Sequence, residues 1–493
     1  MIRTALSVLT RAQASRAIAL ILLVFVVGAT WSVTTPMGAG PDEPNHMATA
    51  YAVAHGEVGR TRVMVPEYIA ALSSERSSCF AFKADQPADC QGELAQSSEL
   101  TQVDTQFGTY FPLYFWVVGA PSLFLSGTSA LAAMRLVSIA LFAIIIGISA
   151  FLATQYEPKA RAAVGVFCSL TPTALFLGGV VNSSSFEIAT AILTWTSALI
   201  AFRADVGALR PRFVAIFVVG ASLLLSSRLL APLWIAIILA SVLTFNGTWK
   251  TFFRFLTTRA GVASTGALTL ILSVTGGWSL THPNHYLGVG GPPTSTREAL
   301  AIFVTSLVRQ SPDLLQSAAG TLGWLETVLA WAPLLVYPTW ALLVGASMNA
   351  ASRTRERAVM AVLCGLGVLL PAALETAMWS GQGWQGRYTL PLLVGIPLVA
   401  AFANNRRDTQ DQARLGAPWT MYSAVTLIFI AGVYSVVMNA HRYSVGLSAS
   451  LLGSTNVWEG PLGFWLPLAA NTLALSAFAG MTLRRVDHRQ ESA

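Results

Sequence analysis

Charge is scarce in this chain of 493 residues: only 11% are charged, whereas 54% are hydrophobic. Short signatures of nucleotide, metal and redox sites are missing as well, since we find no P-loop, no G-x-G-x-x-G after a strand, no H-E-x-x-H and no C-x-x-C. Apolar stretches long enough to cross a bilayer instead recur to the C-terminus. The composition therefore predicts an all-α, polytopic integral membrane protein rather than a soluble enzyme.

The hydropathy pattern predicts about twelve transmembrane helices in one domain over residues 1–493. The first resembles a signal peptide in its charge order, but it is long and lacks a small-x-small cleavage site, so we expect it to stay as a span. The spans lie roughly at residues 17–35, 133–154, 161–179, 184–202, 213–226, 229–246, 260–280, 323–347, 358–375, 388–403, 418–438 and 461–482.

The basic residues decide how the remaining apolar piece, Phe111–Ser126, is placed. It is short and contains Pro112 and Pro121. If it does not cross, 20 of the 30 Lys and Arg residues lie on one side, which the positive-inside rule makes cytoplasmic. If it crosses, most of them lie outside. We therefore predict a re-entrant or interfacial helix, both termini in the cytoplasm, and a multi-pass membrane protein whose first large loop faces the periplasm or cell exterior.

Two large extracytoplasmic loops follow from this topology, a first over residues 36–132 with short helices and a second over residues 281–322. Cysteine is sparse, with four in the chain, and Cys79 and Cys90 share the first loop, where oxidation permits a disulfide. The sequence does not decide whether this disulfide forms. The formal charge of +7 is dispersed through loops, which argues for a topology signal and against nucleic acid as a partner.

The run Gly40-Pro41-Asp42-Glu43-Pro44-Asn45-His46 directly follows the first span. Asp42 and His46 are four residues apart, and Pro44 suits the first turn of a helix, so the spacing aims both side chains into one pocket. Glu43 is the competing carboxylate. The alternative is that these are ordinary solvated charges at a membrane boundary.

A few arginines remain on the predicted outer face, against the positive-inside bias. The guanidinium fork fits a lipid phosphate, although each of these side chains is also able to reach lipid headgroups. Four of them lie at or near the outer ends of predicted spans: Arg135, Arg228, Arg387 and Arg442.

Polar and aromatic residues on the same face suit a sugar, because rings cover its apolar side while amides and carboxylates bond its hydroxyls. The serines after Asn182, with Glu187, favour a helix cap over a site role. Pro283 separates the two histidines of the set, so no shared metal site is predicted. The candidates are Asn182, His282, His285, Trp324, Glu326, Gln385 and Tyr388.

The sequence resembles the GT-C superfamily of polytopic glycosyltransferases. Three features carry this resemblance: Asp42-Glu43 after the first span, the aromatic-proline helix in the first loop, and the segment Met134-Arg135-Leu136-Val137-Ser138. More narrowly it resembles the bacterial membrane family called domain of unknown function 2142. Four segments carry that likeness: Pro41-Asp42-Glu43-Pro44-Asn45-His46, Val181-Asn182, Leu322-Gly323-Trp324-Leu325-Glu326 and Gln385-Gly386-Arg387-Tyr388. The chain departs from the pattern at Ser184 and Glu326, where aspartate is usual.

The resemblance implies a GT-C-like fold in the bacterial inner (plasma) membrane. It also implies transfer of a sugar, with inversion, from a polyprenyl-phosphate donor to a cell-envelope glycan or lipid acceptor. It implies Asp42 as the general base, with Glu43 as the competing base and His46 beside it, and it leaves a divalent cation open as a cofactor. Two alternatives stay open: a transporter or flippase of lipid-linked glycans, and a non-catalytic envelope-assembly subunit. A transporter predicts internal repeats, and we see none.

Overall fold

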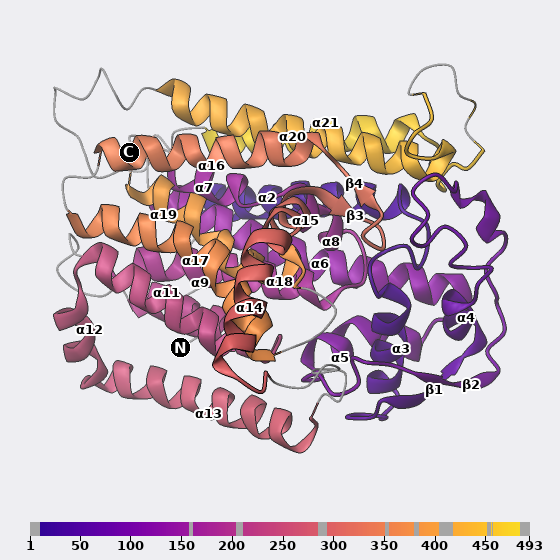
Figure 1. Ribbon diagram of the computed structural model, residues 1–493, viewed down its shortest axis with the longest axis horizontal. Coiled ribbons are helices and arrows are strands. Elements are labelled where there is room, and N and C mark those ends of the chain that lie inside the picture. The colour runs from indigo at the N-terminus through magenta and orange to yellow at the C-terminus, as the bar shows by residue number, and fades with distance from the viewer. Residues whose placement is uncertain are drawn as a thin grey trace.

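The computed structural model describes residues 10–156, 161–203, 211–283, 293–350, 354–378, 384–403, 418–450, 455 and 457–483. Long helices lie side by side along the molecule, and the short elements of residues 36–126, which we call the cap, gather at one end (Figure 1). The elements of the first half are α2 (Arg11–Val33), α3 (Glu43–Ala54), β1 (Arg62–Pro66), α4 (Glu67–Ala70), η1 (Ala71–Ser73), η2 (Ala88–Gln91), β2 (Leu100–Asp104), α5 (Leu113–Gly119), η3 (Ala120–Leu123), α6 (Gly127–Tyr156), α7 (Arg161–Cys168), α8 (Pro172–Gly178), α9 (Ser183–Ala201), α10 (Pro211–Leu225) and α11 (Ala231–Asn246).

The second half is also helical apart from one short hairpin. Its elements are α12 (Trp249–Leu256), α13 (Arg259–Thr281), α14 (Thr296–Thr305), the π-helical turn η5 (Ser306–Gln310), α15 (Ser311–Gly320), β3 (Thr321–Leu322), β4 (Thr327–Val328), α16 (Trp331–Ala350), α17 (Thr354–Met378), α18 (Gly386–Leu393), α19 (Gly395–Ala403), α20 (Pro418–Val445) and α21 (Trp465–Leu483). The helical, polytopic architecture expected from the sequence is confirmed, with two short two-stranded sheets in addition.

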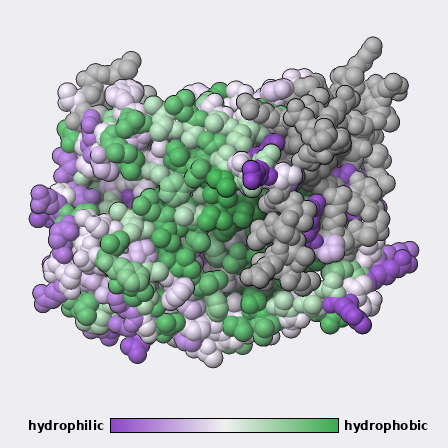
Figure 2. Space-filling model, turned by 180° about the vertical axis from the view of Figure 1, so that it is seen from behind, coloured by the Kyte–Doolittle hydropathy of each residue, from purple (hydrophilic) through white to green (hydrophobic). Residues whose placement is uncertain are grey.

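Nine helical segments of the described residues are long and apolar enough to cross a membrane. Figure 2 shows hydrophobic side chains gathered across the middle of one face, with hydrophilic ones toward its ends, as a lipid-facing surface requires. At the centre α9 is wholly buried and packs against α6 and α10. Its Thr190, Thr194 and Ser197 hydroxyls donate to carbonyls one turn back, so they remain satisfied in apolar surroundings.

Two of the twelve predicted spans differ from the observed helices, one by a break and one by its starting residue. The span predicted at 161–179 is broken into α7 and α8, because Pro172 lacks an N–H and Thr171 caps a new helix there. The span predicted at 323–347 begins late, at Trp331, because residues 321–328 form the β3–β4 hairpin around Gly323 at φ +63°. The spans predicted at 213–226 and 229–246 correspond to α10 and α11, two shorter apolar helices of 15 and 16 residues.

The cap combines the short helices expected there with a two-stranded antiparallel sheet that the sequence did not predict. Strand β1 pairs with β2 in the register Arg62 to Asp104. The apolar piece predicted to lie at the interface forms α5 and η3, of seven and four residues, which are too short to span a bilayer. The cap ends earlier than the predicted residue 132, because α6 begins at Gly127.

The two ends of the described chain lie on one side of the helix layer. Arg16, near the start of α2, donates from Nη2 to the carbonyl of Met481 near the end of α21, at 3.1 Å. Glycines allow α2 to approach α6 closely, since a Cβ on Gly28 would collide with Ile139. The Asp42 run leaves the other end of α2 and is therefore on the opposite side from both described ends.

Candidate active site

Asp42 stands just before α3 with a left-handed backbone, at φ +60° and ψ +13°. Aspartate tolerates this conformation better than most residues. The carboxylate makes no capping bond to α3 and is instead bound by two residues far along the chain: Oδ2 accepts from Arg387 Nη2 at 2.7 Å and Oδ1 from Gln106 Nε2 at 3.3 Å. The Asp42 side chain is 22% exposed, so it keeps access to solvent or substrate.

The neighbouring Glu43 has the opposite environment. Its side chain is 0% exposed and forms a fork with Arg135, whose Nε and Nη2 each donate at 2.7 Å. The same carboxylate accepts from the backbone N–H groups of Gly40 at 3.1 Å and Val181 at 3.0 Å. With four hydrogen bonds made and no exposure, Glu43 holds the cap onto the helices and is poorly placed to receive a proton.

His46 lies on α3 one turn after Asp42, and its backbone N–H donates to the Asp42 carbonyl at 3.0 Å. Its ring stacks on Phe107, with centroids 3.9 Å apart, and faces Phe115 at 5.8 Å. Burial, aided by the charges of Arg228 and Arg387, holds the pKa of His46 well below its usual 6.5. The ring is therefore neutral, and its Nδ1 has no hydrogen-bond partner among the described residues.

Asn182, predicted as a sugar-binding residue, is the N-cap of α9, a role that the sequence had suggested for the serines that follow it, and it also positions the Asp42 run. Its Oδ1 accepts from the backbone of Ser184 at 2.9 Å, while Nδ2 donates to the Pro41 carbonyl at 2.8 Å. Both ends of this amide are thus occupied within the protein. Its place in the structure is that of a residue that holds the backbone of Asp42.

Arg228 and Arg387 converge on one aromatic ring. Their guanidinium carbons lie 4.9 and 5.1 Å from the ring centroid of Tyr388. Arg387 Nη2 bonds Asp42 and also the Tyr388 hydroxyl at 3.1 Å. Arg228 Nη2 donates to the Ser184 hydroxyl at 2.8 Å. An ion pair joins Arg228 Nε to Glu187 Oε2 at 3.5 Å without the geometry of a hydrogen bond.

Donor groups remain unused in this pair. Within the described ranges, Nε and Nη1 of Arg387 and Nε of Arg228 are buried without a hydrogen-bond partner. Buried guanidinium N–H groups are costly to leave unpaired, so the two nitrogens of Arg387 mark a place for an anion, whereas Arg228 Nε faces the Glu187 carboxylate.

Arg135 and Arg442 make a different set of hydrogen bonds, mainly to backbone carbonyls. Arg135 donates to the carbonyls of Ser32, Thr35 and Pro36 in addition to Glu43. Arg442 is 0% exposed and pairs with Glu326 at 3.2 Å.

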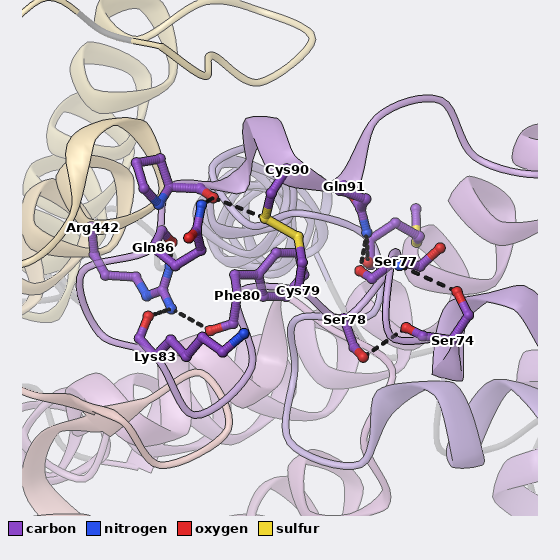
Figure 3. Close-up of a disulfide and its surroundings, with 12 residues drawn as sticks. Ser74, Ser77, Ser78, Cys79, Phe80, Lys83, Gln86, Cys90, Gln91 and Arg442 are labelled. Atoms are coloured by element: carbon purple, nitrogen blue, oxygen red, sulfur yellow. Dashed lines mark hydrogen bonds between the residues drawn. A yellow bond between two sulfur atoms is a disulfide. The ribbon is translucent and has the colours of Figure 1, made fainter.

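The other partners of Arg442 all lie in one small loop. It donates at 2.8 Å to the carbonyls of Phe80, Lys83 and Gln86, inside the loop closed by the Cys79–Cys90 disulfide (Figure 3). Both Arg135 and Arg442 are thus bonded to the protein's own carbonyls, and the structure does not bring them to the Asp42 cluster.

Of the remaining sugar-binding candidates, some lie beside Asp42 and others are bonded elsewhere in the protein. Trp324 donates from Nε1 to the Gly38 carbonyl at 3.1 Å, and its ring lies 5.6 Å from that of Phe82. Gln385 and Tyr388 flank Arg387 at the start of α18, next to Asp42. His282 stacks on Trp278 at 3.9 Å, at the end of α13, and joins none of these groups. His285 lies outside the described residues.

Sequence reasoning missed several members of the Asp42 cluster. Gln106 was not a candidate, and Tyr110 was considered only as part of the aromatic-proline segment of the first loop, although its ring centroid lies 5.8 Å from the Arg228 guanidinium carbon. Glu187 was assigned only to a helix cap, yet it accepts from Trp234 Nε1 at 3.1 Å and faces Arg228. Its place inside the apolar span predicted at residues 184–202 was the available signal, because a carboxylate in apolar surroundings requires partners.

Two cavities border this region. One, of about 380 Å³, is lined by Pro44, Asn45, Phe82 and Trp324 among others. The second, of about 350 Å³, lies between α15 and the start of α18. In the part of the chain that the structure describes, no three His, Cys, Asp or Glu side chains are grouped to hold a metal ion.

Comparison with known proteins gives one family and distant structural likenesses. A family model described as "Predicted membrane protein (DUF2142)" matches residues 25–396. The chain is similar to the crystal structure of ArnT from Cupriavidus metallidurans bound to undecaprenyl phosphate, with a TM-score of 0.44, 12% identity and coverage of 97% of this chain and 79% of that one. The apo structure of the same protein matches with a TM-score of 0.44 and 12% identity, over 94% and 76% of the two chains. No curated protein matches.

Proposed function

The chain belongs to the DUF2142 family of predicted membrane proteins, and from this premise we propose that it is an inverting glycosyltransferase of the GT-C type. It takes a sugar from a polyprenyl-phosphate donor and transfers it to a cell-envelope glycan or lipid. One observation carries the proposal: a partly exposed carboxylate, Asp42, is bonded to an arginine whose other donors are buried and unpaired. A general base and an anion site thus share one cluster.

The place of the cluster suits a lipid phosphate. Arg387 stands in the first turn of α18, and Arg228 stands just before α11, so both guanidinium groups lie at the ends of apolar helices. A headgroup at the membrane surface reaches this depth while its isoprenoid chain stays in the bilayer. By the positive-inside rule this side is the periplasm or cell exterior, opposite the two described ends.

The reaction needs three roles from the chain's residues. Asp42 accepts the proton of the acceptor hydroxyl as its oxygen bonds to the anomeric carbon. The bond from that carbon to the phosphate oxygen breaks on the opposite face, so the configuration inverts. Arg387 and Arg228 bind the phosphate and stabilise the charge that it gains as it leaves, which removes the need for a general acid. His46, one turn after Asp42 on α3, stacks on Phe107 and donates from its backbone to the Asp42 carbonyl.

The first test of this function is Asp42→Asn in the full chain, reconstituted in lipid with a radiolabelled polyprenyl-phosphate sugar. We expect transfer to fall by about 10²–10⁴-fold, the usual contribution of a general base, with donor binding retained. Asp89→Asn, an exposed acid of the same cap, is the matched control and leaves transfer unchanged. An Asp42→Asn protein of normal activity would remove the assignment, and transport of the intact lipid without transfer would favour a flippase.

A further inference from the structure

Two aromatic rings form part of the wall of the larger cavity, beside α3. This cavity measures about 380 Å³ and is lined by Asn45, Phe82, Asp104 and Trp324 among others. The rings of Phe82 and Trp324 lie 5.6 Å apart, and Phe82 is 70% exposed. An acyl chain would bury the Asn45 amide and the Asp104 carboxylate at a cost. A sugar suits the cavity better, because it offers hydroxyls to these groups and C–H bonds to the rings.

The backbone that presents these rings is strained. Among the described residues, three other than glycine have a positive φ: Asp42 at +60°, Phe82 at +59° and Leu325 at +76°. Bulky side chains rarely adopt this conformation, and such residues gather at active sites and ligand clamps. Leu325 directly follows Trp324, whose Nε1 donates to the carbonyl of Gly38, four residues before Asp42. All three strained positions therefore lie at or beside this one cavity.

A buried arginine holds both rings in place. Arg442 donates at 2.8 Å to three carbonyls of the loop that carries Phe82, which the Cys79–Cys90 disulfide closes (Figure 3). It also pairs at 3.2 Å with Glu326, two residues after Trp324. One side chain thus fixes the loop of the first ring and the hairpin of the second. A surface fixed in this way loses little conformational entropy when a ligand binds, which favours affinity.

Two walls of the cavity lead to Asp42. Asn45 is three residues after Asp42, so the two side chains are neighbours on the surface of α3. Strand β2 ends at Asp104 in another wall, and Gln106, two residues farther on, donates to Asp42 Oδ1 at 3.3 Å. Asp42 itself does not line the cavity. A sugar bound against the two rings is therefore next to the proposed base, but it is not the sugar that reacts there.

We propose that this cavity binds one sugar of the acceptor, so that the acceptor is a glycan of two or more sugars and not a lipid without one. The inference rests on the proposed function and names the class of its acceptor. The bound sugar lies with its C–H face against Phe82 and Trp324. Its hydroxyls bond to Asn45 and Asp104. The next sugar of the glycan extends to Asp42 and supplies the hydroxyl that is glycosylated.

The test measures binding of free oligosaccharides to the full chain in nanodiscs by saturation-transfer NMR. The probes are the trimers of glucose, mannose and N-acetylglucosamine, each compared with its monosaccharide. We expect at least one trimer to bind, and to bind more tightly than its monosaccharide. Phe82→Gly and Trp324→Ala should each weaken that binding by about 5- to 10-fold, as expected for the loss of one ring contact. Phe124→Ala, at a ring of the cap that is 86% exposed outside the cavity, is the matched control and leaves it unchanged.

Stability separates a binding role of Phe82 from a structural one. Phe82→Gly removes an exposed ring and places at φ +59° the residue that adopts this backbone without strain. The melting temperature should therefore stay unchanged or rise while the sugar affinity falls. Trp324→Phe loses the hydrogen bond to Gly38 but keeps a ring, so it should melt at a lower temperature and still bind the trimer. A lower melting temperature with unchanged sugar affinity in Phe82→Gly would overturn the proposal.

The outcomes distinguish this inference from the function on which it rests. Trimer binding that survives both Phe82→Gly and Trp324→Ala, or the absence of trimer binding by the natural chain, would overturn the glycan site alone. Binding of undecaprenyl phosphate should be unchanged in Phe82→Gly, because the proposed phosphate site is at Arg228 and Arg387. Trimer binding at these rings in a chain that transfers no sugar would overturn the proposed function and leave a glycan-binding membrane protein.

Discussion

Two pairs of arginines occupy the same end of this molecule and have contrasting environments. Arg135 and Arg442 each donate to three backbone carbonyls and pair with a buried carboxylate. Arg228 and Arg387 lie over one tyrosine ring and keep unpaired donors beside Asp42. A guanidinium that donates to several backbone carbonyls fixes the loops that carry them, whereas one such as Arg387, which donates to no backbone carbonyl among the described residues and keeps two buried nitrogens unpaired, is prepared for an anion. The contrast predicts that the first pair governs folding and the second governs binding.

The largest effect is expected for Arg135→Gln. It leaves Glu43 buried without its cation, and such a loss costs about 3–5 kcal/mol of stability. Little folded protein should be recovered, as measured by size-exclusion profile and thermal unfolding in detergent. Arg62→Gln, at a side chain 68% exposed, is the control and should behave as the natural chain. A stable Arg135→Gln protein with impaired lipid binding would show that Arg135 serves binding rather than folding, and would contradict the proposed division between the two pairs of arginines.

Removal of the disulfide by Cys79→Ser is expected to cost about 2–4 kcal/mol. The three carbonyls that bind Arg442 lie within the loop that this bridge closes, so the two features act on one segment. Combining Cys79→Ser with Arg442→Gln should therefore cost less than the sum of the single changes, as measured in a double-mutant cycle. Additive costs would show that Arg442 stabilises something other than this loop.

Arg387→Gln and Arg228→Gln should weaken binding of undecaprenyl phosphate by about 10- to 100-fold each, because a hydrogen bond to a charged group contributes about 1.5–3 kcal/mol. The melting temperature should change far less than in Arg135→Gln. Binding isotherms and melting curves on the same samples provide the measurement. Unchanged affinity in both variants would remove the anion site and leave the two pairs of arginines alike.

The smallest effect concerns His46. Its pKa is lowered in the folded chain, mainly by burial, so below pH 6.5 the unfolded chain binds the proton that the folded chain refuses. Stability should therefore fall as pH drops through this range, by up to about 1.4 kcal/mol per pH unit. His46→Phe should flatten that part of the profile in thermal unfolding from pH 7 to 5. An unaltered profile would show that another group titrates there.

Sequence reasoning identified the right segments more reliably than the right roles. Asp42, Arg228, Arg387 and Tyr388 were all candidates, and the structure groups them. Arg135, Asn182 and Arg442 were candidates for the same reason, yet their donors end on carbonyls of residues 32–41 and 80–86. Gln106 carried no local signal, because it joins Asp42 only through the fold of the cap.

The sequence by itself determined the polytopic helical architecture and the neighbourhood of the site. Hydrophobic length is a local, additive property of the chain, and it places Asp42 at the end of the first span. Only the tertiary structure decided which carboxylate is exposed and which arginines keep free donors. That outcome depends on partners far apart in sequence, such as Asp42 with Arg387 across 345 residues and Glu43 with Arg135 across 92, because a charged group's free energy is set by its nearest polar neighbours.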